Sequence, residues 1–310
     1  MTLLIHAPPS FRPELYRELI AKQAPDIAVR MRNEAGAPED IVFAAGWNPP
    51  DGFWHQFPNL RGITSLGAGV DSLLRDQDIP PNLPIARLVD GQMARMMAEY
   101  VVLAVLSHRR GGREHVRDPA GAGGGVSLAR PGNQVLILGL GHLGTSVAQA
   151  LQPLGFQVSG WVRTPRESPL PEVRLHHGRT GLQEALPHAD YLVSLLPLTP
   201  ETQNLLDHKL LRQAKPGAYL INTGRGQTVV EQDLLDALDS GLLNGACLDV
   251  FQTEPLPPEH PFLAHPRVMV TPHISSVTPP DSVVPQIIEN YRRARAGEPL
   301  LNLIDRARGY

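Results

Sequence analysis

The feature that most constrains the fold of this 310-residue chain is a glycine-rich turn between a buried strand and a helix. Residues 134–138 (QVLIL) are almost wholly apolar, as a parallel strand covered on both faces requires. They are followed directly by GLGHLG and then by a helical pattern over residues 145–151. The order of strand, turn and helix predicts a unit that binds a dinucleotide, and the alternative is a glycine turn that binds nothing.

Each glycine of this turn has a separate task. The first permits a tight turn, the second lets the backbone approach a diphosphate, and the third allows the helix to pack closely on the strand. The helix then offers free N–H groups and a positive dipole end to the phosphates. The candidate cofactor contacts here are Gly139, Leu140, Gly141, His142, Leu143 and Gly144.

Apolar runs and helical patterns alternate along most of the chain. Strands are expected at residues 2–7, 27–31, 41–45, 62–66, 134–138, 158–162, 191–195, 218–222, 245–249 and 268–270. Helices are expected at residues 12–24, 93–108, 145–151, 203–211, 231–240 and 280–296. This alternation predicts parallel sheets covered by helices. Residues 111–132, rich in Gly, Arg and Pro and without periodicity, are expected to form a surface connection between domains.

Composition narrows the class of protein further. The formal net charge of -3 provides no large basic field, so a nucleic-acid partner is not expected. Cys247, the single cysteine, lies in an apolar run, so we expect a buried thiol and no internal disulfide. The first residues lack a basic segment, and the longest apolar run, residues 100–106, is far shorter than a membrane span. We therefore expect a cytoplasmic protein with no membrane partner and no metal site.

The end of the strand after the glycine turn selects the cofactor. A carboxylate at this place would bond the ribose hydroxyls of NAD, but the sequence from Trp161 to Arg166 reads WVRTPR and holds none. Arg163 and Thr164 could hold a 2′-phosphate, so the sequence favours NADPH, with NADH possible. The alternative is that Arg163 is a solvated surface residue.

Three further segments follow predicted strands and end at the sheet edge where ligands bind in open α/β folds. They are INTGRG (221–226), LDVFQTEP (248–255) and TPHISS (271–276), and they carry Arg225, Glu254 and His273. Reduction of a 2-oxo acid needs a cation for the carboxylate, which Arg supplies bidentately, and a proton donor, for which His is suited. A carboxylate beside the histidine orients its ring and favours its charged form. Singly, each residue could instead be solvated, end a strand or cap a turn.

NTGRG, DVFxxEP and TPHxS, together with GLGHLG, resemble the D-isomer-specific 2-hydroxyacid dehydrogenase family over most of the chain. The resemblance implies that Arg225, Glu254 and His273 are catalytic. It implies two Rossmann/flavodoxin-like domains, each a parallel sheet with helices on both faces, and a cleft between them. The expected domains are 1–98 with 277–310, for substrate, and 99–276, for NAD(P). Further cofactor positions implied are Leu196, Pro197, Thr202, Thr223, Gly224, Asp249, Ser275 and His273 itself.

Within this family the chain is most similar to the glyoxylate/hydroxypyruvate reductases, through AAGWNPP (44–50), MAEYVVLAVLSHRR (97–110), WVRT (161–164) and HISSVTPP (273–280). The similarity implies NADPH-dependent reduction of a small 2-oxo acid to the D-2-hydroxy acid by a homodimer. Implied substrate contacts are Trp47, Leu66, Gly67, Ala68, Gly69 and Arg225.

Two other functions stay open at this point. One is an NADH-linked dehydrogenase for a larger 2-hydroxy acid such as phosphoglycerate, because pocket shape is poorly defined by sequence. The other is a non-enzymatic protein that senses a dinucleotide, since a fold alone does not fix a function. Residues 111–132 also depart from the family, whose members carry aromatic residues there that shape the subunit interface.

Overall fold

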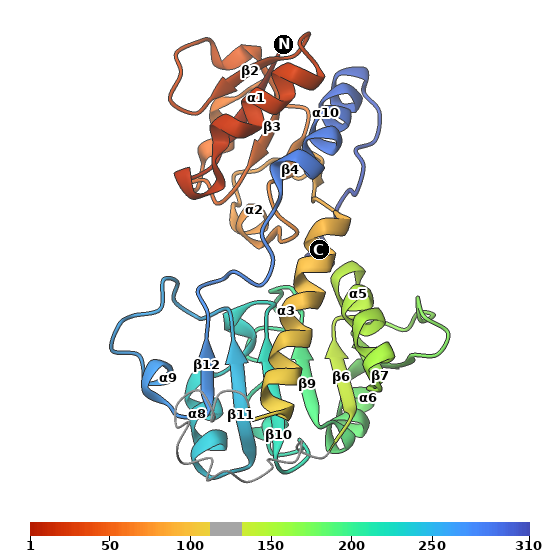
Figure 1. Ribbon diagram of the computed structural model, residues 1–310. Coiled ribbons are helices and arrows are strands. Elements are labelled where there is room, and N and C mark those ends of the chain that lie inside the picture. Colours follow the sequence, from red (N-terminus) through yellow and green to blue (C-terminus); the bar gives the residue numbers. More distant parts are fainter. Residues whose placement is uncertain (112–131) are drawn as a thin grey trace. The chain divides into compact units, whose positions relative to one another are not determined.

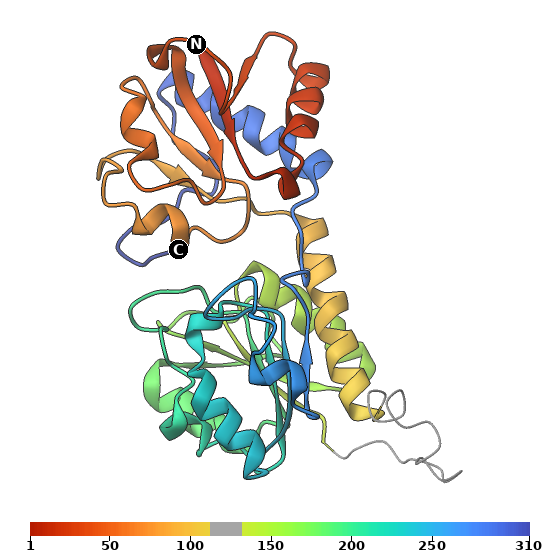
Figure 2. The same cartoon turned by 90° about the vertical axis from the view of Figure 1, so that its left-hand side faces the viewer.

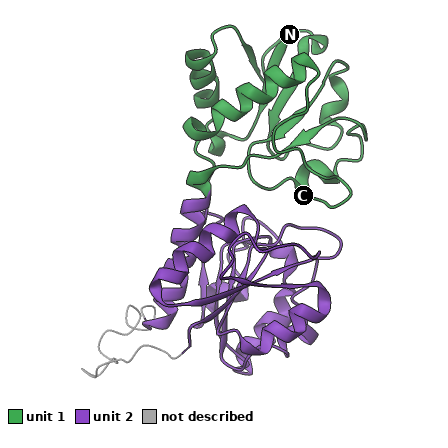
Figure 3. Ribbon diagram, turned by 90° about the vertical axis from the view of Figure 1, so that its right-hand side faces the viewer, with its two compact units in different colours: residues 1–93, 277–310 green, residues 94–276 purple. Residues whose placement is uncertain are grey.

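The structure is a computed structural model that describes residues 1–111 and 132–310 (Figure 1). It divides into two compact units, residues 1–93 with 277–310 and residues 94–276 (Figure 3). Helix α3 (Gly91–Arg109) carries the chain from the first unit into the second, so the expected boundary after residue 98 falls inside this helix. The expected surface connection, apart from its end residues, lies outside the described residues.

The first unit contains a five-stranded parallel sheet with the order β2-β1-β3-β4-β5. This is the flavodoxin-like order. The strands are β1 (Thr2–His6), β2 (Ala28–Met31), β3 (Ile41–Gly46), β4 (Ile63–Ser65) and β5 (Ile85–Ala86). Strand β5 was not expected from the sequence, because two residues are too few to produce a periodic pattern.

Helices cover both faces of this sheet. On one face, α1 (Pro13–Gln23) and α10 (Pro280–Ala296) bury Tyr16, Ile20 and Ile287 against strands β1 and β3 (Figure 1). The other face packs against α2 (Asp71–Arg75) and the short helical segment Phe53–Gln56, through Leu73 and Trp54. The N-terminal strand and the C-terminal helix therefore share one core, although they lie at opposite ends of the sequence.

The second unit contains a seven-stranded parallel sheet with the order β12-β11-β10-β9-β6-β7-β8. The strands are β6 (Gln134–Leu138), β7 (Gln157–Val162), β8 (Arg174–His177), β9 (Tyr191–Ser194), β10 (Ala218–Asn222), β11 (Leu243–Leu248) and β12 (Val268–Val270). The strand order reverses between β6 and β9, and ligands of such sheets bind where this reversal occurs. The predicted fold class, two parallel sheets with helices on both faces, is confirmed.

Two hydrophobic clusters lie on opposite faces of the seven-stranded sheet. Helices α3 and α5 (His142–Leu151) pack on one face, where Val101 and Val147 contact the same cluster as Ile137 (Figures 1 and 2). Helices α6 (Gly178–Ala185), α7 (His208–Leu211) and α8 (Glu231–Asp239) pack on the other. Cys247 of β11 is fully buried, as expected. Within the described ranges, no helix combines the length and apolarity that crossing a membrane needs.

The prediction of a helix at residues 203–211 is wrong for residues 203–207. Only His208–Leu211 is helical, because the Asp207 side chain accepts a hydrogen bond from the Leu210 N–H at 2.8 Å and starts the helix there. Leu206 forms a parallel bridge with Val229 instead. Strand β8 was not expected from the sequence either, because its residues RLHH contain no apolar run.

Candidate active site

The glycine turn after β6 has the geometry that the sequence predicts. Gly139 has a φ of +97°, and its N–H donates to the carbonyl oxygen of Trp161 at 2.9 Å. A Cβ on Gly144 would lie 2.3 Å from the Gly139 carbonyl oxygen, so only glycine lets α5 start this close to the strand. A Cβ on Gly141 would meet no described atom within 4 Å, which leaves the backbone open to a ligand.

Two hydroxyl groups beside this turn have no hydrogen-bond partner among the described residues. They are Ser194 Oγ, at the end of β9, and Thr223 Oγ1, just after β10, and both side chains are buried. The two residues are adjacent, since the Thr223 N–H donates to the Ser194 carbonyl oxygen at 3.1 Å. Buried hydroxyls are nearly always hydrogen-bonded, so this edge of the sheet fits the polar groups of a dinucleotide.

At the end of β7, two arginines are bonded to neighbouring loops. Arg163 pairs with Glu201 at 2.8 Å, and Arg166 donates a hydrogen bond to the Leu140 carbonyl oxygen. Thr164 is exposed between them. Trp161 is part of the hydrophobic core: the residue is 5% exposed and its indole N–H donates to the Gly178 carbonyl oxygen at 2.8 Å.

The loops after β9 and β10 are in direct contact. Thr202 is buried, and its hydroxyl donates to the Pro197 carbonyl oxygen at 2.6 Å, which folds the first loop back on itself. A Cβ on Gly224 would lie 2.6 Å from the carbonyl oxygen of Leu196, so this glycine allows the second loop to approach the first. The expected cofactor positions in the two loops therefore lie side by side.

Glu254 and His273 form a hydrogen-bonded pair. Glu254 Oε2 lies 2.8 Å from His273 Nδ1, and Glu254 Oε1 accepts the N–H of Phe251 at 3.0 Å. Burial raises the pKa of Glu254. The hydrogen bonds from His273 and Phe251 and the charges of His273 and Arg225 outweigh it and hold that pKa below its ordinary value. The carboxylate therefore stays charged, and the second ring nitrogen of His273, Nε2, points away from it.

Arg225 is held in a tight turn at the end of β10. Its carbonyl oxygen accepts hydrogen bonds from Thr228 Oγ1 at 2.6 Å and from Asn222 Nδ2 at 3.1 Å. One guanidinium nitrogen donates to the Gly224 carbonyl oxygen at 2.8 Å. The charge of Arg225 helps to lower the pKa of Glu254. Arg225, Glu254 and His273 therefore interact electrostatically within the second unit.

The side chain of Asp249 is hydrogen-bonded to the loop that carries His273. Its side chain is fully buried: Oδ1 accepts the hydroxyl of Thr271 at 2.6 Å and the N–H of Ile274 at 2.9 Å, and Oδ2 accepts the N–H of Ser275 at 2.8 Å. These bonds hold the loop that carries His273. Which partners a buried carboxylate finds depends on tertiary structure, so no sequence pattern signals this role.

The expected substrate-binding residues of the first unit also lie together. The Trp47 ring stacks on Phe11 with centroids 5.2 Å apart. A Cβ on Gly67 would lie 2.4 Å from that indole ring, so glycine is needed beside it. The hydroxyl of Ser65 accepts the Gly67 N–H at 3.2 Å and donates to the Gly69 carbonyl oxygen at 2.7 Å, which closes the loop. Leu66 is buried, while Ala68 and Gly69 are partly exposed.

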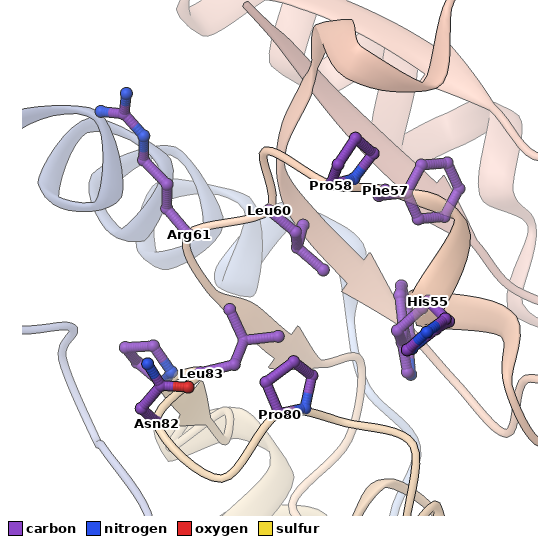
Figure 4. A pocket seen from close by; sticks show the side chains of 10 residues that line it. His55, Phe57, Pro58, Leu60, Arg61, Pro80, Asn82 and Leu83 are labelled. Atoms are coloured by element: carbon purple, nitrogen blue, oxygen red, sulfur yellow. The ribbon is translucent and has the colours of Figure 1, made fainter.

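A cavity of about 430 Å³ in the first unit lies elsewhere (Figure 4). Its lining is formed by Trp54, His55, Phe57, Pro58, Leu60, Arg61, Pro80, Asn82, Leu83 and Pro84. None of the expected site residues is among them, and the lining contains no carboxylate. Arg61 donates to the Arg295 carbonyl oxygen at 3.1 Å. The cavity therefore lacks the acid–base pair found in the second unit.

A dinucleotide-type turn and an arginine, glutamate and histidine at the ends of parallel strands define the class of nicotinamide-dependent α/β dehydrogenases. The profile of the family "D-isomer specific 2-hydroxyacid dehydrogenase, NAD binding domain" matches residues 102–275. The chain belongs to the D-isomer specific 2-hydroxyacid dehydrogenase family.

Three relatives cover nearly the whole chain. Glyoxylate/hydroxypyruvate reductase A of Photorhabdus laumondii is 38% identical over 97% of this chain and 98% of its own length. A D-isomer specific 2-hydroxyacid dehydrogenase from Xanthobacter autotrophicus Py2, solved with NADPH and MES, matches with a TM-score of 0.92, 39% identity, and coverage of 100% and 99%. The NADPH-dependent glyoxylate/hydroxypyruvate reductase of Sinorhizobium meliloti was solved with NADP and sulfate. It matches with a TM-score of 0.89, 32% identity, and coverage of 100% of both chains.

Proposed function

We propose that the protein is an NADPH-dependent reductase of small 2-oxo acids that converts glyoxylate to glycolate and hydroxypyruvate to D-glycerate. The observation that carries this proposal is the Glu254–His273 hydrogen bond of 2.8 Å, with the Arg225 charge acting on the same carboxylate. Support comes from the relatives named as glyoxylate/hydroxypyruvate reductases.

The cofactor would be held by the glycine turn and the neighbouring loops of the second unit. The residues proposed for this are Gly139 to Gly144, Leu196, Pro197, Thr202, Thr223, Gly224, His273 and Ser275, with Arg163 and Thr164 at the 2′-phosphate. Trp161 and Asp249 would support this site from within the second unit. Trp161 packs in the core, and Asp249 holds the loop that carries His273. When bound, the nicotinamide supplies the hydride.

The chain's own residues would perform the remaining steps. Arg225 binds the substrate carboxylate and polarises the carbonyl group, because its planar fork matches two oxygens. His273 donates a proton from Nε2 to the carbonyl oxygen, and Glu254 at Nδ1 stabilises the charged ring before that transfer. Trp47 and the backbone of Leu66, Gly67, Ala68 and Gly69 are proposed to bind the substrate from the first unit.

Turnover measurements with a panel of 2-oxo acids and both reduced cofactors test this proposal. We expect activity with glyoxylate and hydroxypyruvate, a lower KM for NADPH than for NADH, and a kcat lowered about 10²–10⁴-fold in His273→Gln, since proton donation is lost. Faster turnover of phosphohydroxypyruvate with NADH would favour the dehydrogenase of larger acids. NADPH binding without turnover of any 2-oxo acid would favour a sensor.

We also propose that the protein acts in the cytoplasm as a homodimer, as the family resemblance implies. Light scattering on the purified protein should then give twice the chain mass of 33.8 kDa. A mass equal to one chain at micromolar concentration would exclude the dimer.

A further inference from the structure

A chain of side-chain hydrogen bonds connects helix α3 to the loop that carries His273. The hydroxyl of Tyr100, on α3, is hydrogen-bonded to the hydroxyl of Thr271, just after β12. The Thr271 hydroxyl in turn lies 2.6 Å from Asp249 Oδ1. Tyr100 also lies 3.3 Å from Cys247 Sγ, so its hydroxyl is held on two sides.

The direction of these hydrogen bonds follows from the groups involved. A carboxylate only accepts, so the single proton of the Thr271 hydroxyl is donated to Asp249. The oxygen of Thr271 must then accept the proton of Tyr100. Burial raises the pKa of Tyr100, with further contributions from Cys247 and Asp249, so the phenol is neutral and can donate. The chain runs from Tyr100 through Thr271 to Asp249.

Asp249 also accepts hydrogen bonds from His273 and from the two residues that follow it. Its side chain accepts the N–H groups of Ile274 and Ser275, and its carbonyl oxygen accepts the N–H of His273 at 2.9 Å. His273 has a φ of +54°, a left-handed conformation that costs a non-glycine residue about 1 kcal/mol or more. The conformation therefore depends on bonds from outside the loop.

We propose that Tyr100 is a positioning residue, which acts through Thr271 and Asp249 to hold His273 where its Nδ1 meets Glu254. The proposal rests on the proposed function, because it assigns His273 as the proton donor. The chain passes from one unit to the other after Met93 and again after Ser276. Tyr100 follows the first of these points in the sequence, and Thr271 precedes the second. Tyr100 itself touches neither substrate nor cofactor in this role.

The variant Tyr100→Phe tests the proposal, because it removes the hydroxyl and keeps the ring. We expect kcat with glyoxylate to fall about 10-fold, since small displacements of a catalytic group reduce rates steeply. The affinity for NADPH, measured by fluorescence titration, should stay unchanged. The alkaline pH at which activity is lost should move to a lower value, because the Glu254–His273 bond is weakened.

Matched variants separate positioning from a loss of stability. Thr271→Val should reproduce the effect, Thr271→Ser should retain activity, and the double variant Tyr100→Phe/Thr271→Val should be no worse than either single change. Tyr16→Phe is the control, because the buried Tyr16 hydroxyl has no hydrogen-bond partner among the described residues. It should leave kcat and the pH profile unchanged.

A second readout does not need activity. In ¹⁵N-histidine NMR spectra of the protein without cofactor, assigned with His273→Gln, the downfield Nδ1–H signal of His273 should weaken or shift in Tyr100→Phe. An unchanged signal, kcat and pH profile would overturn the proposal, and so would a loss of activity that only matches the loss of folded protein. If the wild type reduces no 2-oxo acid, the proposed function fails and the NMR signal alone decides this inference.

Discussion

His6 is a buried histidine for which the proposed chemistry has no use. It ends β1, is 3% exposed, and lies against Phe53 with ring centroids 4.3 Å apart and the rings tilted by 44°. Burial, and secondarily the charge of Arg32, lower its pKa from 6.5 to about 4. Between pH 6.5 and about pH 4, His6 binds a proton in the unfolded chain but not in the folded protein. Stability contributed by His6 is therefore complete above pH 6.5 and is lost as the pH falls toward 4, by about 3 kcal/mol.

Urea unfolding at pH 7.5 and pH 4.5 measures this effect. His6→Phe removes the titrating group and keeps a ring against Phe53, so its stability should depend less on pH than that of the wild type. His55→Gln changes an exposed histidine and should behave like the wild type. If His6→Phe and the wild type lose stability in parallel, the His6 ring is protonated without cost and the prediction is wrong.

Among the secondary-structure elements, strands that are buried on both faces are predicted well from the sequence. Residues 134–138 and 218–222 were predicted with their observed bounds, because complete burial demands continuous apolar runs. The edge strands β5 and β8 were not predicted, since the two residues of β5 are too few for a periodic pattern and the residues RLHH of β8 contain no apolar run. The helix expected at 203–211 failed because a single capping residue, Asp207, decided where it begins.

The same limit applies to the candidate site. Motifs of the sequence predicted Arg225, Glu254 and His273, and the structure brings Glu254 and His273 into contact. The roles of Trp161 and Asp249 could not be predicted, because strand-end residues can face a ligand or the core. Only the fold decides that Trp161 donates to Gly178 and that Asp249 holds a loop.

The contact between the Arg225 loop and the Glu254 loop gives a prediction at this scale. A Cβ on Gly226, next to Arg225, would lie 2.0 Å from the carbonyl carbon of Phe251, a backbone atom that cannot turn aside. Gly226→Ala should therefore separate the Arg225 loop from the Glu254 loop. We expect it to lower the free energy of unfolding by about 2–3 kcal/mol and to remove most activity.

Gly91→Ala is the matched control, because a Cβ there would meet no described atom within 4 Å. It should change stability by less than about 0.5 kcal/mol and keep kcat. Thermal unfolding and glyoxylate turnover of both variants decide the question. Equal behaviour of the two variants would mean that the two loops are less closely packed than the structure has them.

At the scale of the whole molecule, the proposed cofactor site belongs to one unit. The glycine turn, the loop at 194–202, the turn at 222–226 and the loop at 271–275 all follow strands of the seven-stranded sheet. Hydrogen exchange with and without NADPH should show protection in these four segments. At a concentration 100 times the dissociation constant, binding should stabilise the folded protein by about 2.7 kcal/mol. Protection at residues 54–61 and 80–84 instead would place the cofactor in the cavity of the first unit.

We expect Arg163 to decide the choice between the two cofactors. Its guanidinium is 2.8 Å from Glu201 and its side chain is 24% exposed, so a 2′-phosphate would compete with a carboxylate that is itself mostly exposed. Since a surface pair of this kind contributes about 1 kcal/mol or less, the phosphate should displace it. Arg163→Ala should then reduce the stabilisation by NADPH and leave that by NADH nearly unchanged, while Arg212→Ala, on the exposed face of another segment, should alter neither. An equal loss for both cofactors in Arg163→Ala would mean that this arginine supports the fold of the strand end and does not read the phosphate.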